Sequence, residues 1–139
     1  MKSTEYPALF ADVKTIAVHG MSRAANKPSH TVPRYMHEQG YKLFPINPWA
    51  DEILGLKVYR SLAEIPERID LLNVFRPSHQ VPAVVEEALE RRRLHGDIDY
   101  IWLQLGIMND EARAMAEAAG IAFVQNRCIY VEHLHAVPG

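Results

Sequence analysis

The sequence is poor in cysteine and has no long hydrophobic run. Its single cysteine, Cys128, excludes an intramolecular disulfide and a metal site built from several cysteines. No run approaches the length of a membrane span, and residues 1–10 contain no apolar stretch followed by a small-residue cleavage site. We therefore expect a cytoplasmic protein with no membrane partner.

The sequence also lacks an excess of charge of either sign. A formal net charge of −2 and a pI of about 6.4 give no basic surface of the kind that nucleic-acid binding requires, so no nucleic-acid partner is expected. An apolar content of 48% and a length of 139 residues suit one globular domain. We expect a single domain over residues 1–139, in which 1–12 and 134–139 are terminal extensions.

Apolar, β-rich runs alternate with segments of helical periodicity along the chain. This alternation indicates βαβ units, in which parallel strands are joined by helices that cover both faces of a sheet. Ser29 is expected to cap the first helix, Pro33 to lie in its first turn and Gly40 to end it. Residues 49–66 are expected to be loops with a short edge strand and a helical turn capped by Ser61. The prediction is a Rossmann-like α/β fold, an open parallel sheet of about five strands (15–20, 41–48, 70–75, 100–106 and 121–126) with helices at 29–40, 78–93 and 109–120.

Small, amide and cationic residues follow the predicted strands. Because ligands in such folds bind beyond the carboxyl ends of the strands, these residues form the candidate site. Acid–base catalysis would place His, Asp, Glu or Lys at this edge, whereas the residues present carry mostly amides, a hydroxyl and guanidinium groups. The pattern favours binding over catalysis. In strand order, the candidates are Gly20 and Ser22, Asn47 and Pro48, Phe75 and Arg76, Gln104 and Gly106, and Asn126 and Arg127.

The first of these loops, GMSRAANKPS at residues 20–29, has the chemistry of a phosphate site. Its glycine permits a tight turn, Ser22 offers a hydroxyl, and Arg23 and Lys27 supply positive charge. Ser29 begins a helix whose N–H groups and dipole favour phosphate. The loop therefore suits a nucleotide diphosphate. One glycine in place of three leaves a plain βα loop with two solvated cations as an equal alternative.

Five short motifs occur in order along the chain: KPS, INP, FRP, WLQLG and NRC. In this combination they resemble the stand-alone bacterial CoA-binding domain family, which is similar to the N-terminal CoA-binding domain of the succinyl-CoA synthetase α subunit. The resemblance extends from Thr15 to His133, nearly the whole chain. It implies a Rossmann-type domain that holds CoA at the carboxyl edge of its sheet. The residues that it implies are Gly20, Ser22, Arg23 and Lys27–Ser29 for the ADP part, and Asn47, Phe75, Arg76 and Gln104 for the adenosine and pantetheine.

Three positions depart from the pattern of that family. His19 stands where a small or apolar residue usually precedes the glycine, and Trp49 stands where lysine commonly follows NP. Asn126 replaces a common aspartate before RC. The missing lysine weakens a phosphate contact, whereas an indole can stack on adenine.

Other groups have both a chemical and a structural interpretation. Cys128, next to Arg127, is a candidate nucleophile or mixed-disulfide partner, but a lone cysteine is more often a small buried hydrophobe. The segment Glu132–His135 is a candidate metal site, but histidines two residues apart do not share a helical face, which favours a solvated tail and no metal. The basic cluster Glu90–Gly96 is expected to be a solvated helix end. Surface positions are expected for His30, His37 and His79.

Three functions are open at this point. The first is binding of CoA or acyl-CoA through its ADP and pyrophosphate moiety, as a carrier, sensor or regulatory module without its own catalysis, alone or with an unidentified protein partner. The second is an NAD- or NADP-binding oxidoreductase or redox-sensing domain, since both ligand types share this fold. The acidic residue that it needs after the second strand would be Asp51. The third, a CoA-linked thiol enzyme, would use Cys128.

Overall fold

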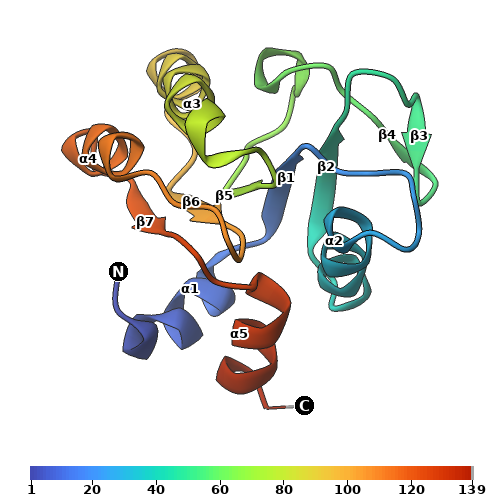
Figure 1. Cartoon of the computed structure of the whole chain (residues 1–139), viewed down its shortest axis with the longest axis horizontal. Coiled ribbons are helices and arrows are strands. Elements are labelled where there is room, and N and C mark those ends of the chain that lie inside the picture. The colour runs from blue at the N-terminus through green and yellow to red at the C-terminus, as the bar shows by residue number, and fades with distance from the viewer. Residues whose placement is uncertain (139) are drawn as a thin grey trace.

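The core of the protein is a five-stranded parallel sheet, which confirms the predicted Rossmann-like α/β fold (Figure 1). The computed structural model describes residues 1–138, so Gly139, the last residue of the expected C-terminal extension, lies outside the described residues. The strand order is β2-β1-β5-β6-β7. Because the order reverses beside β1, the crevice between β1 and β5 is the switch point at which such sheets bind ligands. The strands are β1 (Thr15–His19), β2 (Lys42–Ile46), β5 (Leu71–Val74), β6 (Tyr100–Leu103) and β7 (Ala122–Val124).

Helices cover both faces of the sheet. α3 and α4 lie on one face, and α1, α2 and α5 lie on the other (Figure 1). Two hydrophobic clusters result, one with Leu72 and Val74 of β5 and Val85 of α3, the other with Trp102 of β6 and Ile129 of α5. The strands are apolar runs in the sequence because both of their faces are covered. The helices are α1 (Tyr6–Asp12), α2 (Pro28–Glu38), α3 (Val81–His95), α4 (Asp110–Ala118) and α5 (Ile129–Ala136).

The edge strand expected within residues 49–66 is reduced to one bridge, in which Tyr59 pairs in parallel with Ile46 of β2 at the edge of the main sheet. Before it, β3 (Glu52–Ile53) and β4 (Leu56–Lys57) pair with each other in a separate antiparallel hairpin. Leu54 and Gly55 between them both have positive φ, the geometry of a two-residue hairpin turn. The predicted helical turn after Ser61 is confirmed, although the Ser61 side chain makes no capping hydrogen bond. The 3₁₀-helices are η1 (Ser3–Glu5), η2 (Leu62–Glu64) and η3 (Ser78–Gln80).

The N-cap of helix α2 lies two residues earlier than predicted. Lys27 is its N-cap and Pro28 its first residue, because the fixed φ of proline suits the first position of a helix. Ser29 is therefore not the cap, and Pro33 lies inside the helix rather than in its first turn. Pro33 has no N–H to donate to the Ser29 carbonyl four residues earlier. That carbonyl instead accepts the N–H of Ser22 at 3.1 Å, which attaches the preceding loop to the helix.

Both chain ends form helices that pack against the sheet, which the sequence did not predict. The rings of Tyr6 and Phe10 in α1 lie 5.1 and 5.9 Å from the ring of Trp102. His133 in α5 is only 4% exposed, and its Nδ1 lies 2.8 Å from the Tyr35 hydroxyl of α2. The interpretation of this C-terminal segment as a solvated tail is therefore wrong.

Two other side chains expected at the surface are buried. His30 is 6% exposed, whereas His37 and His79 are exposed as predicted. In the basic cluster at the end of α3, Arg91 is 3% exposed and pairs with the carboxylate of Asp97. This helix end is therefore solvated only in part.

The burial of His133 predicts that acid weakens the fold. Burial lowers the pKa of His133 below its usual value of about 6.5. Because the unfolded chain then binds a proton more readily than the folded protein, the free energy of unfolding falls as the pH drops through and below about 6.5. We expect the urea midpoint to decrease from about pH 7.5 to about pH 5.5, and to decrease less in His133→Gln. His135→Gln, an exposed position of the same helix, should keep the wild-type slope; equal slopes in all three proteins would contradict this account.

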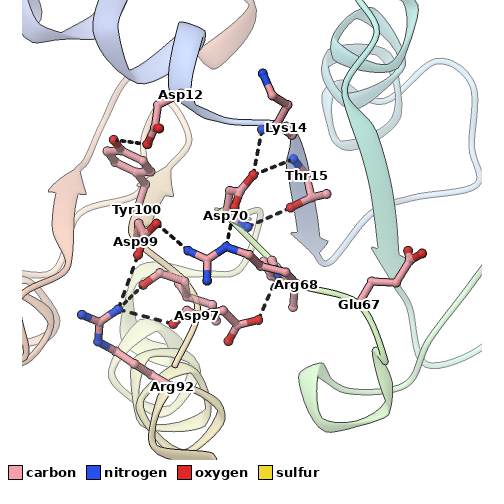
Figure 2. Close-up of polar contacts among 12 residues, drawn as sticks. Asp12, Lys14, Thr15, Glu67, Arg68, Asp70, Arg92, Asp97, Asp99 and Tyr100 are labelled. Carbon is pink, nitrogen blue, oxygen red and sulfur yellow. Dashed lines mark hydrogen bonds and ion pairs between the residues drawn. The ribbon is translucent and has the colours of Figure 1, made fainter. Parts of the chain in front are cut away.

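Polar side chains at the amino edge of the sheet pair with one another (Figure 2). Asp70 Oδ2 accepts the backbone N–H groups of Lys14 and Thr15 at 2.8 and 3.2 Å. The guanidinium of Arg68 bridges the carboxylates of Asp70 and Asp99 at 3.0 and 2.7 Å. These contacts join the starts of β1, β5 and β6. The amino edge is therefore held together by its own charges, opposite the edge where ligands are expected.

Candidate functional site

A groove of about 340 Å³ opens at the carboxyl edge of the sheet. Its walls come from the start of α2, the loop between β5 and α3, and the loop between β6 and α4. Four of the predicted binding residues, Lys27, Ser29, Phe75 and Arg76, meet there although they come from distant parts of the sequence. The remaining lining residues are Pro28, Pro77 and Ile107.

Gly20 lets the end of β1 approach the end of β5. Its φ is +88°, in the left-handed region that favours glycine. A Cβ at this position would lie 2.7 Å from the carbonyl oxygen of Phe75 and 3.1 Å from Cδ of Arg76. The glycine is therefore required both by the turn and by the close contact that brings the first loop next to the groove.

The loop between Gly20 and Lys27 has a defined shape. Ser22 Oγ accepts the N–H of Ala24 at 3.0 Å, and the Ser22 carbonyl accepts Nδ1–H of His30 at 2.8 Å. His30 is buried, and through this hydrogen bond its ring holds the loop in place. The loop is therefore preorganised from both of its ends, which lowers the entropic cost of holding a ligand.

Two cations, Lys27 and Arg76, line the groove, and a third, Arg23, lies in the loop that precedes α2. Arg23 and Lys27 are exposed, and Arg76 is partly exposed. Within residues 1–138, none of the three forms an ion pair with a carboxylate. In the first turn of α2, Pro28 has no N–H and the N–H of His30 donates to the Lys27 carbonyl at 2.9 Å, so the N–H of Ser29 is the donor left for a ligand. The groove is therefore suited to a phosphorylated ligand.

Two predicted binding residues, Asn47 and Gln104, use their side chains to fix loops. Asn47 Nδ2 donates to the carbonyl of Met21 at 2.8 Å, and its Oδ1 accepts the N–H groups of Trp49 and Ala50. These bonds connect the end of β2 to the first loop.

Gln104 is 4% exposed, and its Oε1 accepts the N–H of Ile129 at the start of α5. The sequence alone does not show that the side chains of Asn47 and Gln104 fix loops, because their partners lie far along the chain or on the backbone.

A second pocket, of about 330 Å³, lies beside the groove and shares Arg76 with it. In this pocket Nε2 of His19 lies 2.9 Å from Oε1 of Glu87, whose Oε2 accepts the N–H of Leu62 at 2.8 Å. Burial raises the pKa of Glu87, but the hydrogen bonds from His19 and Leu62 and the charges of His19 and Arg76 outweigh it and lower the pKa. We call this the His19 pocket; its lining residues are His19, Arg76, Gln80, Ala83, Val84 and Glu87.

In the sequence, His19 stands out only because it departs from a family pattern, and Glu87 does not stand out at all. Glu87 lies in a helix that carries many charged residues, so nothing in the sequence distinguishes it. Only the fold brings α3 next to the end of β1.

Other candidate residues lie apart from the groove lining. The indole of Trp49 is 82% exposed after β2. Cys128 is the N-cap residue of α5, and its partly buried side chain packs against the cluster that contains Trp102. Arg127 is exposed, and its carbonyl accepts the indole N–H of Trp102 at 2.8 Å.

Neither a membrane span nor a metal cluster is found in the described part of the chain. From residue 1 to residue 138, no helix is long and apolar enough to cross a bilayer. The same residues contain no group of three or more His, Cys, Asp or Glu side chains arranged to hold a metal ion.

A comparison with known protein families identifies the family of the chain. The sequence profile of the CoA binding domain family matches residues 14–134, most of the chain. The chain belongs to this CoA-binding domain family. The resemblance carried by the five motifs is therefore confirmed.

Similar proteins of this family include stand-alone chains and parts of larger enzymes. YneT of Bacillus subtilis is 42% identical over 120 residues, which cover 86% of this chain and 85% of YneT. An ADP-forming acetate–CoA ligase II of Archaeoglobus fulgidus is 36% identical over 80 residues, 56% of this chain, but the match spans only 12% of the ligase. A Thermus thermophilus structure described as cell-free ID.343 has 37% identity and a TM-score of 0.89, covering 98% of this chain and 99% of that one.

Proposed function

We propose that this CoA-binding domain holds CoA or acyl-CoA through its ADP and pyrophosphate moiety at the carboxyl-edge groove. It would act as a carrier, sensor or regulatory module without catalysis of its own. The observation that carries the proposal is the convergence of Lys27, Ser29 and Arg76 on one groove at the switch point, in a chain of the CoA-binding family.

The physical chemistry of the groove supports a pyrophosphate. The unpaired cations Arg23, Lys27 and Arg76 offset the phosphate charges, and the α2 dipole adds a favourable potential. The Phe75 and Ile107 side chains give the groove an apolar wall, which suits the less polar pantetheine arm.

The surroundings of the groove support CoA over a nicotinamide nucleotide. Asp51, the acid needed after β2 for the ribose hydroxyls of NAD, pairs with Arg60 at 2.7 Å. The groove itself is lined by an ammonium, a hydroxyl and a guanidinium group, which suit binding more than acid–base chemistry.

Isothermal titration of CoA tests this proposal, with NAD and NADP as separate ligands. We expect CoA to bind near one per chain, and the Arg23→Ala, Lys27→Ala double variant to bind roughly 10- to 100-fold more weakly, because each charge-assisted contact contributes about 1.5–3 kcal/mol before solvent screening. A Lys42→Ala, Lys57→Ala variant removes the same charge outside the groove lining and should bind normally. Absence of CoA binding, with binding of NAD or NADP, would overturn the proposal.

A further inference from the structure

The loop between β6 and α4 differs from the other loops at the carboxyl edge because its middle is wholly apolar. Residues 105–108, which we call the apolar loop, are Leu, Gly, Ile and Met, without a charged or hydrogen-bonding side chain. Leu105 is 70% exposed and Met108 is 49% exposed. The loop after each of the other four strands contains a charged residue: Arg23, Asp51, Arg76 and Arg127. One loop of the ligand edge therefore presents apolar side chains where the others present charge.

The apolar loop is held in a fixed shape by its backbone. The N–H groups of residues 106, 107 and 108 each have an acceptor. In order, the acceptors are Oδ1 of Asn126 at 2.8 Å, the Gln104 carbonyl at 2.9 Å and Oγ of Ser78 at 3.0 Å. Leu105 and Met108 therefore stay at the surface unless these bonds break. A ligand that covers them removes apolar area from water without having to order the loop.

The apolar loop continues one wall of the groove. Ile107 lines the groove, and Met108 is bonded through its N–H to Ser78, which follows the lining residue Pro77. Because β5 lies between β1 and β6, the loops after β1 and β6 border the groove from opposite sides. A ligand whose phosphates lie at Lys27, at the start of α2, therefore reaches the apolar loop with its other end.

We infer that the apolar loop holds the acyl chain of an acyl-CoA, so that the ligand of this protein is a thioester with an aliphatic chain rather than free CoA. This inference rests on the proposed function. The pantetheine arm separates the pyrophosphate of CoA from its thiol, so phosphates bound at α2 direct the thioester across the groove. Burial of each methylene group against Leu105 and Met108 favours binding. A chain that ends in a carboxylate would find no counter-charge on residues 105–108.

The small size of the apolar loop favours an acyl chain over a protein partner. A stable protein interface covers about 800 Å² and roughly 20–30 residues on each partner. Here two large apolar side chains, Leu105 and Met108, are exposed next to the groove. Within residues 1–138, the other large exposed apolar side chains lie elsewhere: Trp49, Leu94, Val131, Leu134 and Val137. Two side chains suit one aliphatic chain that is already anchored by its phosphates.

Isothermal titration of CoA, acetyl-CoA and octanoyl-CoA tests the inference. We expect wild type to bind octanoyl-CoA at least about tenfold more tightly than acetyl-CoA, because each fully buried methylene group strengthens binding about fourfold. The Leu105→Ser, Met108→Ser double variant should bring this ratio close to one. Leu94→Ser, Leu134→Ser is the matched control: it removes two exposed apolar side chains on α3 and α5 and should keep the wild-type ratio.

A second measurement locates the chain without changing its binding site. In protein labelled with ¹³C at the methionine methyl groups, the Met108 signal, assigned by its loss in Met108→Leu, should shift with octanoyl-CoA and not with CoA. The signal of Met36, which is 1% exposed in α2, should stay in place with both ligands.

The possible failures of this test are distinguishable. Equal affinity of wild type for the three ligands, or weaker binding of octanoyl-CoA, would overturn the acyl assignment, leave CoA binding intact and make a protein partner the better occupant of the apolar loop. A preference for octanoyl-CoA that persists in the Leu105→Ser, Met108→Ser variant would overturn the role of this loop. Failure of all three ligands to bind would overturn the proposed function itself.

Discussion

Replacing Arg91 by alanine is expected to lower the free energy of unfolding by about 3–5 kcal/mol, because it leaves a buried charge without its partner. Arg91 and Asp97 pair at 2.9 Å, and each side chain is only 2% exposed. The same guanidinium donates to the carbonyl oxygens of Leu62, Ile65 and Glu67. Its loss therefore removes the cation from beside the Asp97 carboxylate, which keeps the N–H of Ile69 as a donor, and breaks three bonds to carbonyl groups. The attachment of the η2 segment to α3 is weakened, although the N–H of Leu62 still donates to Glu87.

Urea denaturation of Arg91→Ala and Arg93→Ala measures this effect. Arg93 lies two residues further along α3 and pairs with Glu90, but both of these side chains are more than half exposed. Exposed pairs contribute about 0–1 kcal/mol, so Arg93→Ala should unfold almost like wild type. Similar small losses in both variants would show that the buried pair does not hold η2 in place.

Gly20→Ala is expected to destabilise the fold by roughly 2–4 kcal/mol and to weaken CoA binding. The left-handed φ of +88° costs an alanine about 1–2 kcal/mol, and the contact of its Cβ with the Phe75 carbonyl, 2.7 Å away, forces the two loops apart at a further cost of about 1–3 kcal/mol. The movement displaces Arg76, which borders both the groove and the His19 pocket.

Gly40→Ala is the matched control for this variant. Gly40 has a φ of +100°, but a Cβ there meets nothing within 4 Å. It therefore incurs the backbone cost alone, and we expect a loss of about 1–2 kcal/mol with unchanged CoA affinity. Thermal unfolding and titration of both variants separate the backbone term from the close contact; equal behaviour would contradict the importance of the approach between β1 and β5.

The sheet could be predicted from the sequence because its strands are buried on both faces. The run from Thr15 to His19 and the run from Leu71 to Val74 are mostly apolar and rich in branched residues, and β1 and β5 occupy them. The helices at the two chain ends gave no comparable signal. α1 and α5 are short, and the burial of their side chains depends on each other and on α2, so their role became visible only in the folded structure.

The candidate site could be predicted in its chemistry but not in its detail. Lys27 and Arg76 were identified because their strands end at one edge, a rule that follows from topology alone. Ser29 was expected to cap the helix, so the bond from the N–H of Ser22 to the Ser29 carbonyl, which Pro33 leaves free, was not predicted. The contact between His19 and Glu87 depends on the packing of α3 over β1, which residue patterns do not encode.

The central claim, that CoA binds at the carboxyl edge, is tested most directly by ¹H–¹⁵N correlation spectra of the labelled protein during a CoA titration. The account predicts that the amides of residues 20–27, Ser29, Phe75 and Arg76 shift with a single dissociation constant. The amides of Asp70 and Asp99, in the paired network at the amino edge (Figure 2), should stay in place. Shifts centred on the amino edge, or no shifts at all with saturating CoA, would contradict the account.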